Sequence, residues 1–199
     1  MARILVRPVL PIVITLSLSL SAGCSGLLGG PYERANGYVA EANEAIEEHN
    51  QLFEDARGTY EEARESVEAG EVTSQETTSQ EADRITQARE TMQEARDTLE
   101  EAREPLSEVQ DLEVEAEILE YTGLLSEAVD AQLAAESEEI RFYEILEEDP
   151  TLAENREEAE EILAGVGEGY EEAEDAYDRA QEVADANPEL LPEESQASR

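Results

Sequence analysis

Residues 85–109 read ITQARETMQEARDTLEEAREPLSEV. Apolar side chains recur in this stretch at alternating steps of three and four residues, and large side chains alternate with alanines along most of it. They are Ile85, Ala88, Met92, Ala95, Leu99, Ala102, Leu106 and Val109. Such steps place side chains on one face of an α-helix and approach the heptad of a coiled coil. The stretch therefore predicts a long helix whose apolar face packs against other helices.

Four segments of the chain show this spacing. They cover residues 32–69, 74–109, 112–148 and 151–187. Helices of roughly 35 to 38 residues are each about 55 Å long at about 1.5 Å per residue, and the connections between them are short. Long helices with short connections favour antiparallel neighbours. The predicted fold is therefore all-α, an antiparallel four-helix bundle built from coiled-coil hairpins.

Pro105 lies inside the apolar face of the second segment. Proline lacks a backbone N–H and crowds the preceding turn, so the helix is expected to kink or to stop early at this residue. Beyond Val109 the apolar phase changes, and Asp111 is a suitable cap for the third helix. If Pro105 only bends one continuous helix, the alternative is a longer three-helix coiled coil.

The third segment has the widest apolar face of the four. Its main face holds Val114, Ile118, Tyr121, Leu125, Ala128, Ala135, Phe142 and Leu146. Four further side chains widen it, namely Leu124, Leu133, Ile140 and Tyr143. A wide apolar face indicates contact with more than one neighbouring helix. We therefore expect this helix to be the most buried.

Three glycines alternate with other residues in the fourth segment, at Gly165, Gly167 and Gly169. Each costs a helix up to about 1 kcal/mol relative to alanine, so the segment is predicted to be a hinge, a distortion or a site of close helix approach. If the helix opens, a partner or ligand could enter here. A phosphate-binding loop is rejected, because no strand precedes the glycines and no lysine follows them.

His49 is the only histidine, and it lies on the apolar face of the first segment. A polar layer that sets the register of the helices is favoured there over a metal ligand or a catalyst. Di-iron bundles use Glu-x-x-His on two helices, whereas residue 46 is Ile and no second histidine exists. The many glutamates single out no acid–base pair. We therefore predict no catalytic residue, no metal site, no cofactor and no enzymatic activity.

The net charge of −39 comes from 43 glutamates and 9 aspartates against 13 arginines, without a single lysine. Such a surface repels phosphate backbones, which argues against nucleic acid as a partner. It also repels anionic lipid headgroups, so the helical body should stand off a membrane. Two causes of the acid excess are favoured over recognition of a cationic partner: solvation of long helices by glutamate, and adaptation to a salty or hot habitat. Because glutamate forms helices better than aspartate does, its excess favours helix formation as the cause.

The N-terminus has the pattern of a secretory signal. Arg3 and Arg7 precede an apolar run over residues 9–20, and small residues lead to Cys24, the only cysteine. Residues 20–24, Leu-Ser-Ala-Gly-Cys, resemble the lipobox of bacterial lipoproteins. The resemblance implies cleavage before Cys24, a lipid on its thiol, and anchoring to the extracytoplasmic face of the cell membrane, or to an outer membrane if the cell has one. The alternative is an ordinary cleaved signal in which Cys24 is incidental.

These features divide the chain into four parts. We expect a signal peptide at 1–23, a flexible tether at 24–31, the helical bundle at 32–187 and a disordered acidic tail at 188–199. The predicted function is that of a non-enzymatic spacer, scaffold or protein-interaction module of the cell envelope. Its partners are the membrane, through Cys24, and a protein or a second copy, through the helices. The alternative is a sensory or ligand-binding lipoprotein that holds a small cationic or hydrophobic molecule between helices near Gly165–Gly169.

Overall fold

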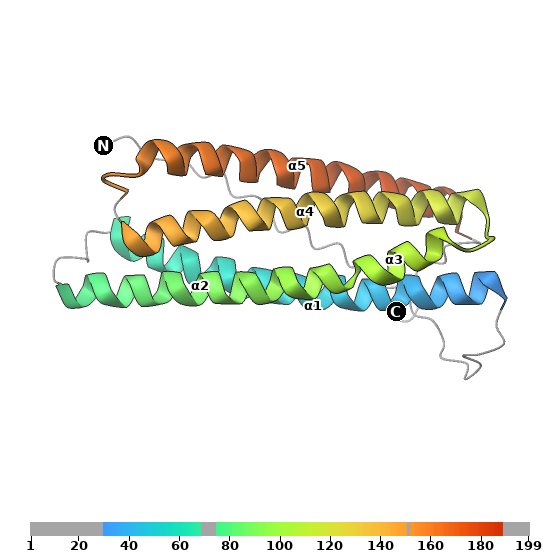
Figure 1. Ribbon diagram of the computed structural model, residues 1–199, viewed down its shortest axis with the longest axis horizontal. Helices are drawn as coiled ribbons and strands as arrows, with labels where there is room; N and C mark the ends of the chain where they lie inside the picture. The colour runs from blue at the N-terminus through green and yellow to red at the C-terminus, as the bar shows by residue number, and fades with distance from the viewer. Residues whose placement is uncertain (1–29, 69–74, 151, 189–199) are drawn as a thin grey trace, which may run out of the picture.

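The computed structural model describes residues 30–68, 75–150 and 152–188, with side chains at all of these except 67, 68 and 75–78. Its elements are α1 (Pro31–Glu68), α2 (Gln75–Glu101), α3 (Arg103–Gln110), α4 (Ala116–Glu148) and α5 (Arg156–Ala186). The longer helices α1, α2, α4 and α5 lie lengthwise beside one another as rods, and α3 continues the line of α2 and rises toward α4 (Figure 1). The predicted all-α, antiparallel four-helix bundle is confirmed.

The rods pack as two close pairs. α1 lies along α2, α4 lies along α5, and α2 joins the pairs by packing against α4, while α3 touches both α1 and α4. α1 and α5 are not among the pairs whose backbones pack closely. Side chains connect these two helices, as in the contact between the rings of Phe53 and Tyr170, whose centroids lie 5.6 Å apart. Within the described residues, no helix is long and apolar enough to cross a membrane.

Pro105 breaks the second rod. α2 ends at Glu101 and α3 begins at Arg103, because proline cannot donate a bond to the carbonyl of residue 101 and its ring crowds that carbonyl. At the break, the Ala102 N–H donates to the carbonyl of Leu99, three residues earlier and 3.1 Å away. Leu99, Ala102 and Leu106 stay fully buried across the break. The kink or early stop predicted at Pro105 is therefore observed as a break of one residue between α2 and α3, and the apolar face continues through it.

The third helix begins later than predicted. It starts at Ala116 rather than at 112, and Asp111 is not its cap. The intervening residues carry the chain from the α3 rod to α4, and Leu112 and Val114 pack half-buried against the core on the way. The Gln110 side-chain amide ties the two helices together by donating to Thr122 Oγ1 at 2.7 Å. Packing of Leu112 and Val114 against the core therefore decides where α4 begins, and the capping potential of Asp111 does not.

The fourth helix also begins later, at Arg156 rather than at 151. Leu152 has a positive φ of 50°, which is incompatible with a helix at that position. An Asp149 carboxylate oxygen accepts the Glu154 N–H at 2.9 Å and holds the turn. The short connection between the first two predicted helices, at residues 69–74, the tether over 24–29 and the tail over 189–199 lie outside the described residues.

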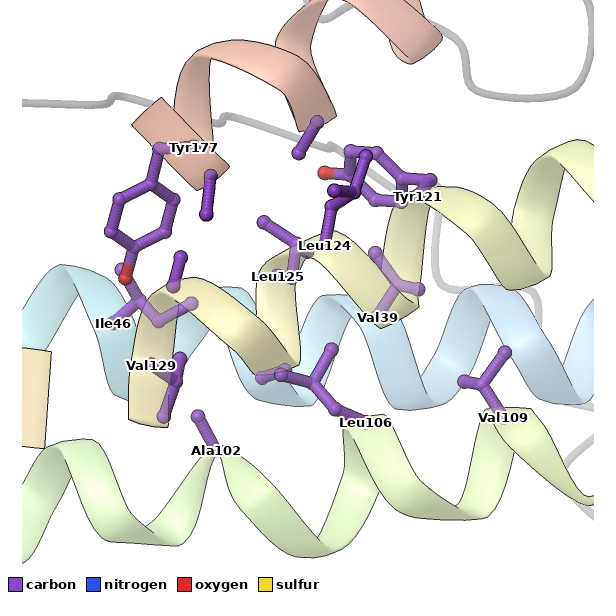
Figure 2. Close-up of a cluster of buried hydrophobic side chains, with 14 of the residues drawn as sticks. Val39, Ile46, Ala102, Leu106, Val109, Tyr121, Leu124, Leu125, Val129 and Tyr177 are labelled. Atoms are coloured by element: carbon purple, nitrogen blue, oxygen red, sulfur yellow. The ribbon is translucent and has the colours of Figure 1, made fainter. Parts of the chain in front are cut away.

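Two apolar clusters fill the interior. The α3 cluster occupies the end of the bundle where α3 lies and includes Leu106, Leu125 and Tyr177 (Figure 2). The Tyr143 cluster occupies the other end and includes Phe53, Met92 and Tyr143. α4 contributes to both, with sixteen buried residues out of 33. The prediction that this helix is the most buried is confirmed.

Candidate functional site

A layer of polar side chains lies between the two apolar clusters. His49 stands on α1 between Ile46 of the α3 cluster and Phe53 of the Tyr143 cluster. We call the whole set the buried polar layer. It consists of His49 and Arg57 from α1, Gln132, Glu136, Glu139 and Tyr143 from α4, and Tyr170 and Tyr177 from α5. All of its members except Arg57 are buried.

The first half of the layer centres on His49. Its Nε2 atom lies 2.7 Å from Glu136 Oε1, and neither side chain has any exposed surface. Its Nδ1 atom lies 3.2 Å from Asn50 Oδ1. The Gln132 amide nitrogen lies 3.3 Å from Nε2, and the Tyr177 hydroxyl donates to Gln132 Oε1 at 3.2 Å. His49 therefore lies in a polar layer, as its place on the apolar face predicted.

The second half centres on the Glu139 carboxylate. The hydroxyls of Tyr143 and Tyr170 donate to its two oxygens at 2.7 and 2.6 Å. Arg57 donates to the same oxygens from Nε at 3.3 Å and from Nη2 at 3.4 Å. The Arg57 guanidinium also lies over the rings of Phe53 and Tyr170, at 4.9 and 5.3 Å from their centroids. One arginine and two phenols thus satisfy this buried negative charge.

Burial governs the protonation of the layer. Desolvation raises the pKa of Glu136, and His49 offsets only part of that increase. Desolvation and the adjacent Glu139 charge raise the pKa of both Tyr143 and Tyr170. Burial lowers the pKa of Arg57, but Glu139, Tyr170 and Tyr143 together more than compensate and the net shift is upward. The phenols therefore stay neutral donors and Arg57 stays charged.

Of the α4 members of the layer, Tyr143 was predicted to lie on the apolar face, whereas Gln132, Glu136 and Glu139 were not singled out. The apolar spacing on that helix passes through Ala128, Ala135 and Phe142, and positions 132 and 139 complete its steps of three and four with Gln and Glu. A polar residue at a position that completes an apolar stripe was therefore the sequence signal that could have identified Gln132 and Glu139 as members of a buried polar layer. His49 shows the same signal on the apolar face of the first segment.

The three predicted glycines lie within one continuous helix, α5. A Cβ atom built on Gly169 would lie 2.9 Å from Ala135 Cβ, whereas one on Gly165 or Gly167 would meet nothing within 4 Å. Gly169 is therefore a site of close approach between α5 and α4. The roles of hinge and binding region for Gly165, Gly167 and Gly169 stay predictions.

The glycines give a matched pair of variants. Gly165→Ala is expected to raise the free energy of unfolding by about 0.5–1 kcal/mol, because alanine suits a helix interior and the space is open. Gly169→Ala is expected to lower it by about 1–3 kcal/mol, because its methyl group would push α5 away from Ala135. Urea unfolding measures both, with Gly167→Ala as a second open-space control. Equal effects at positions 165 and 169 would contradict the close approach.

Cys24 lies outside the described residues. Among the residues that the structure does describe, no group of three or more His, Cys, Asp or Glu side chains is placed to hold a metal ion. The chain matches no known family model, and neither a curated protein nor a solved structure shows significant similarity to it. A functional assignment must therefore come from the chemistry of its residues.

Proposed function

We propose that this protein is a lipid-anchored, non-enzymatic spacer, scaffold or protein-interaction module on the extracytoplasmic face of a cell membrane. The observation that carries the proposal is the enclosure of the polar layer. Glu136, Tyr143 and Tyr170, whose pKa values burial has shifted, are buried among other side chains of the bundle. A catalytic group must reach its substrate. What this bundle offers to other molecules is its acidic outer surface.

The N-terminal pattern supports the anchor. A positive region, an apolar run and small residues before Cys24 are the features of a lipoprotein signal. A bundle of four rods, the longest spanning Pro31–Glu68, supplies about 55 Å of reach at about 1.5 Å per residue. Its carboxylates and anionic headgroups repel each other, which favours a rod that extends away from the lipid surface.

Labelling with palmitate in a bacterial host tests the anchor. The full chain is expected to incorporate the label and to fractionate with membranes. Cys24→Ser should abolish labelling, because serine offers no thiol for the lipid, and Ser25→Ala should leave it intact as a matched control. Equal labelling of the Cys24→Ser chain, or none of the parent chain, would overturn the proposed anchor.

Crosslinking in intact cells, with partners identified by mass spectrometry, tests the interaction role. Crosslinks to another envelope protein would identify an adaptor, and crosslinks only between copies of the chain would favour a spacer. Because the proposed contacts use the outer surface, a folded Glu136→Gln variant should give the same crosslinks as the parent. Selective loss of a partner in that variant would show that the buried layer takes part in recognition and would contradict a purely surface role.

A further inference from the structure

The contact between His49 Nε2 and Glu136 Oε1 requires a proton between these two atoms. In the structure, Nδ1 of His49 lies 3.2 Å from Oδ1 of Asn50. This side-chain amide oxygen can only accept a hydrogen bond, so in this arrangement Nδ1 carries a hydrogen and donates it. The 2.7 Å between Nε2 and Glu136 Oε1 is a hydrogen-bond distance, and two lone pairs would repel each other there. A second proton therefore lies between these atoms. The pair holds one proton more than a neutral imidazole and a carboxylate hold separately.

Loss of this proton would leave an uncompensated negative charge in the interior. Neither His49 nor Glu136 has exposed surface, and Glu136 Oε2 already has no hydrogen-bond partner. Glu139, another carboxylate, lies one turn further along α4, where its repulsion disfavours ionisation of Glu136. A buried charge without a partner is strongly unfavourable.

The charged and titratable groups around the pair are already engaged. On α1 and α4, Arg57 is bonded to Glu139, as are the hydroxyls of Tyr143 and Tyr170. On α5, Tyr177 donates to Gln132. On α2, Arg96 bonds to the hydroxyl of Ser137, and the buried side chains at this level are the apolar Met92, Ala95 and Leu99. None of these groups supplies a spare positive charge to Glu136.

We propose that the His49–Glu136 pair is a proton-binding latch: closure of the bundle traps one proton, which opening of the bundle releases at neutral and alkaline pH. The latch does not depend on the membrane anchor. The folded chain binds one more proton than the unfolded chain once the unfolded histidine has lost its proton, above about pH 6.5. Stability is therefore fully present below that pH and falls as the pH rises above it.

The composition of the chain isolates this effect. His49 is the only histidine, there is no lysine, and Cys24 is the only thiol. With Cys24→Ser, no other side chain ordinarily titrates between about pH 7 and 8, because the tyrosines of the unfolded chain ionise only near pH 10. The α-amino group does so, but it is common to all variants. The pH dependence of stability in this window therefore reports the pair.

Urea unfolding of the full chain with Cys24→Ser, in detergent micelles at pH 7, 7.5 and 8, tests the latch. The unfolding equilibrium constant of this parent is expected to increase by up to about tenfold per pH unit. Glu136→Gln should abolish that slope, because the amide can donate to Nε2 without a titratable proton. Glu138→Gln, at a half-exposed carboxylate on the same helix, should keep it. A flat profile for the parent, or an unchanged slope in Glu136→Gln, would overturn the proposal.

A direct proton count covers the case in which Glu136→Gln does not fold. The parent is unfolded by a urea jump at pH 8 in weak buffer, and a pH indicator measures the protons released. We expect nearly one proton per chain. Release of none would refute the latch.

Discussion

Glu139→Ala is expected to lower the free energy of unfolding by about 3–5 kcal/mol, the usual cost of removing one partner from a buried ion pair. The carboxylate accepts hydrogen bonds from Arg57, Tyr143 and Tyr170. Without it, a guanidinium whose side chain is only 21% exposed loses its counter-charge. Two buried hydroxyls lose their acceptor as well.

Urea or thermal unfolding measures this loss. Glu120→Ala, which removes an exposed carboxylate from the same helix, should change stability by no more than about 0.5 kcal/mol. A double variant with Arg57→Met and Glu139→Met should recover part of the loss, because it removes both charges together. Similar stabilities for Glu139→Ala and Glu120→Ala would show that the ion pair contributes little.

Phe53→Ala is expected to destabilise the bundle by about 3–5 kcal/mol. The backbones of α1 and α5 do not pack closely, and Phe53 bridges them by an edge contact with the Tyr170 ring, 5.6 Å between centroids. Its ring also lies beneath the Arg57 guanidinium and beside His49. Truncation would therefore open a cavity next to the buried polar layer.

The neighbouring residue supplies the control for Phe53. Leu52 is half-buried, and Leu52→Ala should cost no more than about 1.5 kcal/mol. Equal losses at the two positions would mean that the seam between α1 and α5 is not held by Phe53. Because Phe53 and Glu139 both contact Arg57, their effects should be non-additive, which a double-mutant cycle measures.

Apolar spacing was sufficient to predict the architecture. The faces traced through Ile85, Met92 and Leu99 are buried as expected, because helix packing requires only that apolar residues recur at the helical period. Helix starts were predicted less well. Asp111 is a good local cap, but the chain first crosses between rods, and Leu112 and Val114 are held by tertiary packing. A signal confined to a few residues cannot report that packing.

The buried polar layer was only partly predictable, for a statistical and a physical reason. With 43 glutamates in the chain, the identity of Glu136 or Glu139 carries little information. What distinguishes them is the donors that face them from other helices, such as His49 and Arg57. Those pairings lie more than eighty residues apart in sequence and depend on the register of α1 against α4.

That register has a mechanical consequence. A bundle with uniform alanine and leucine faces can slide by one heptad at small cost, which would change its length. Here, sliding α1 by seven residues would set Ala42 or Ala56, instead of His49, against Glu136. The carboxyl group would then face a methyl group in the interior. The contact between His49 and Glu136 therefore disfavours sliding of α1 along α4. The bundle then has one defined length, which is the property required of a molecular ruler.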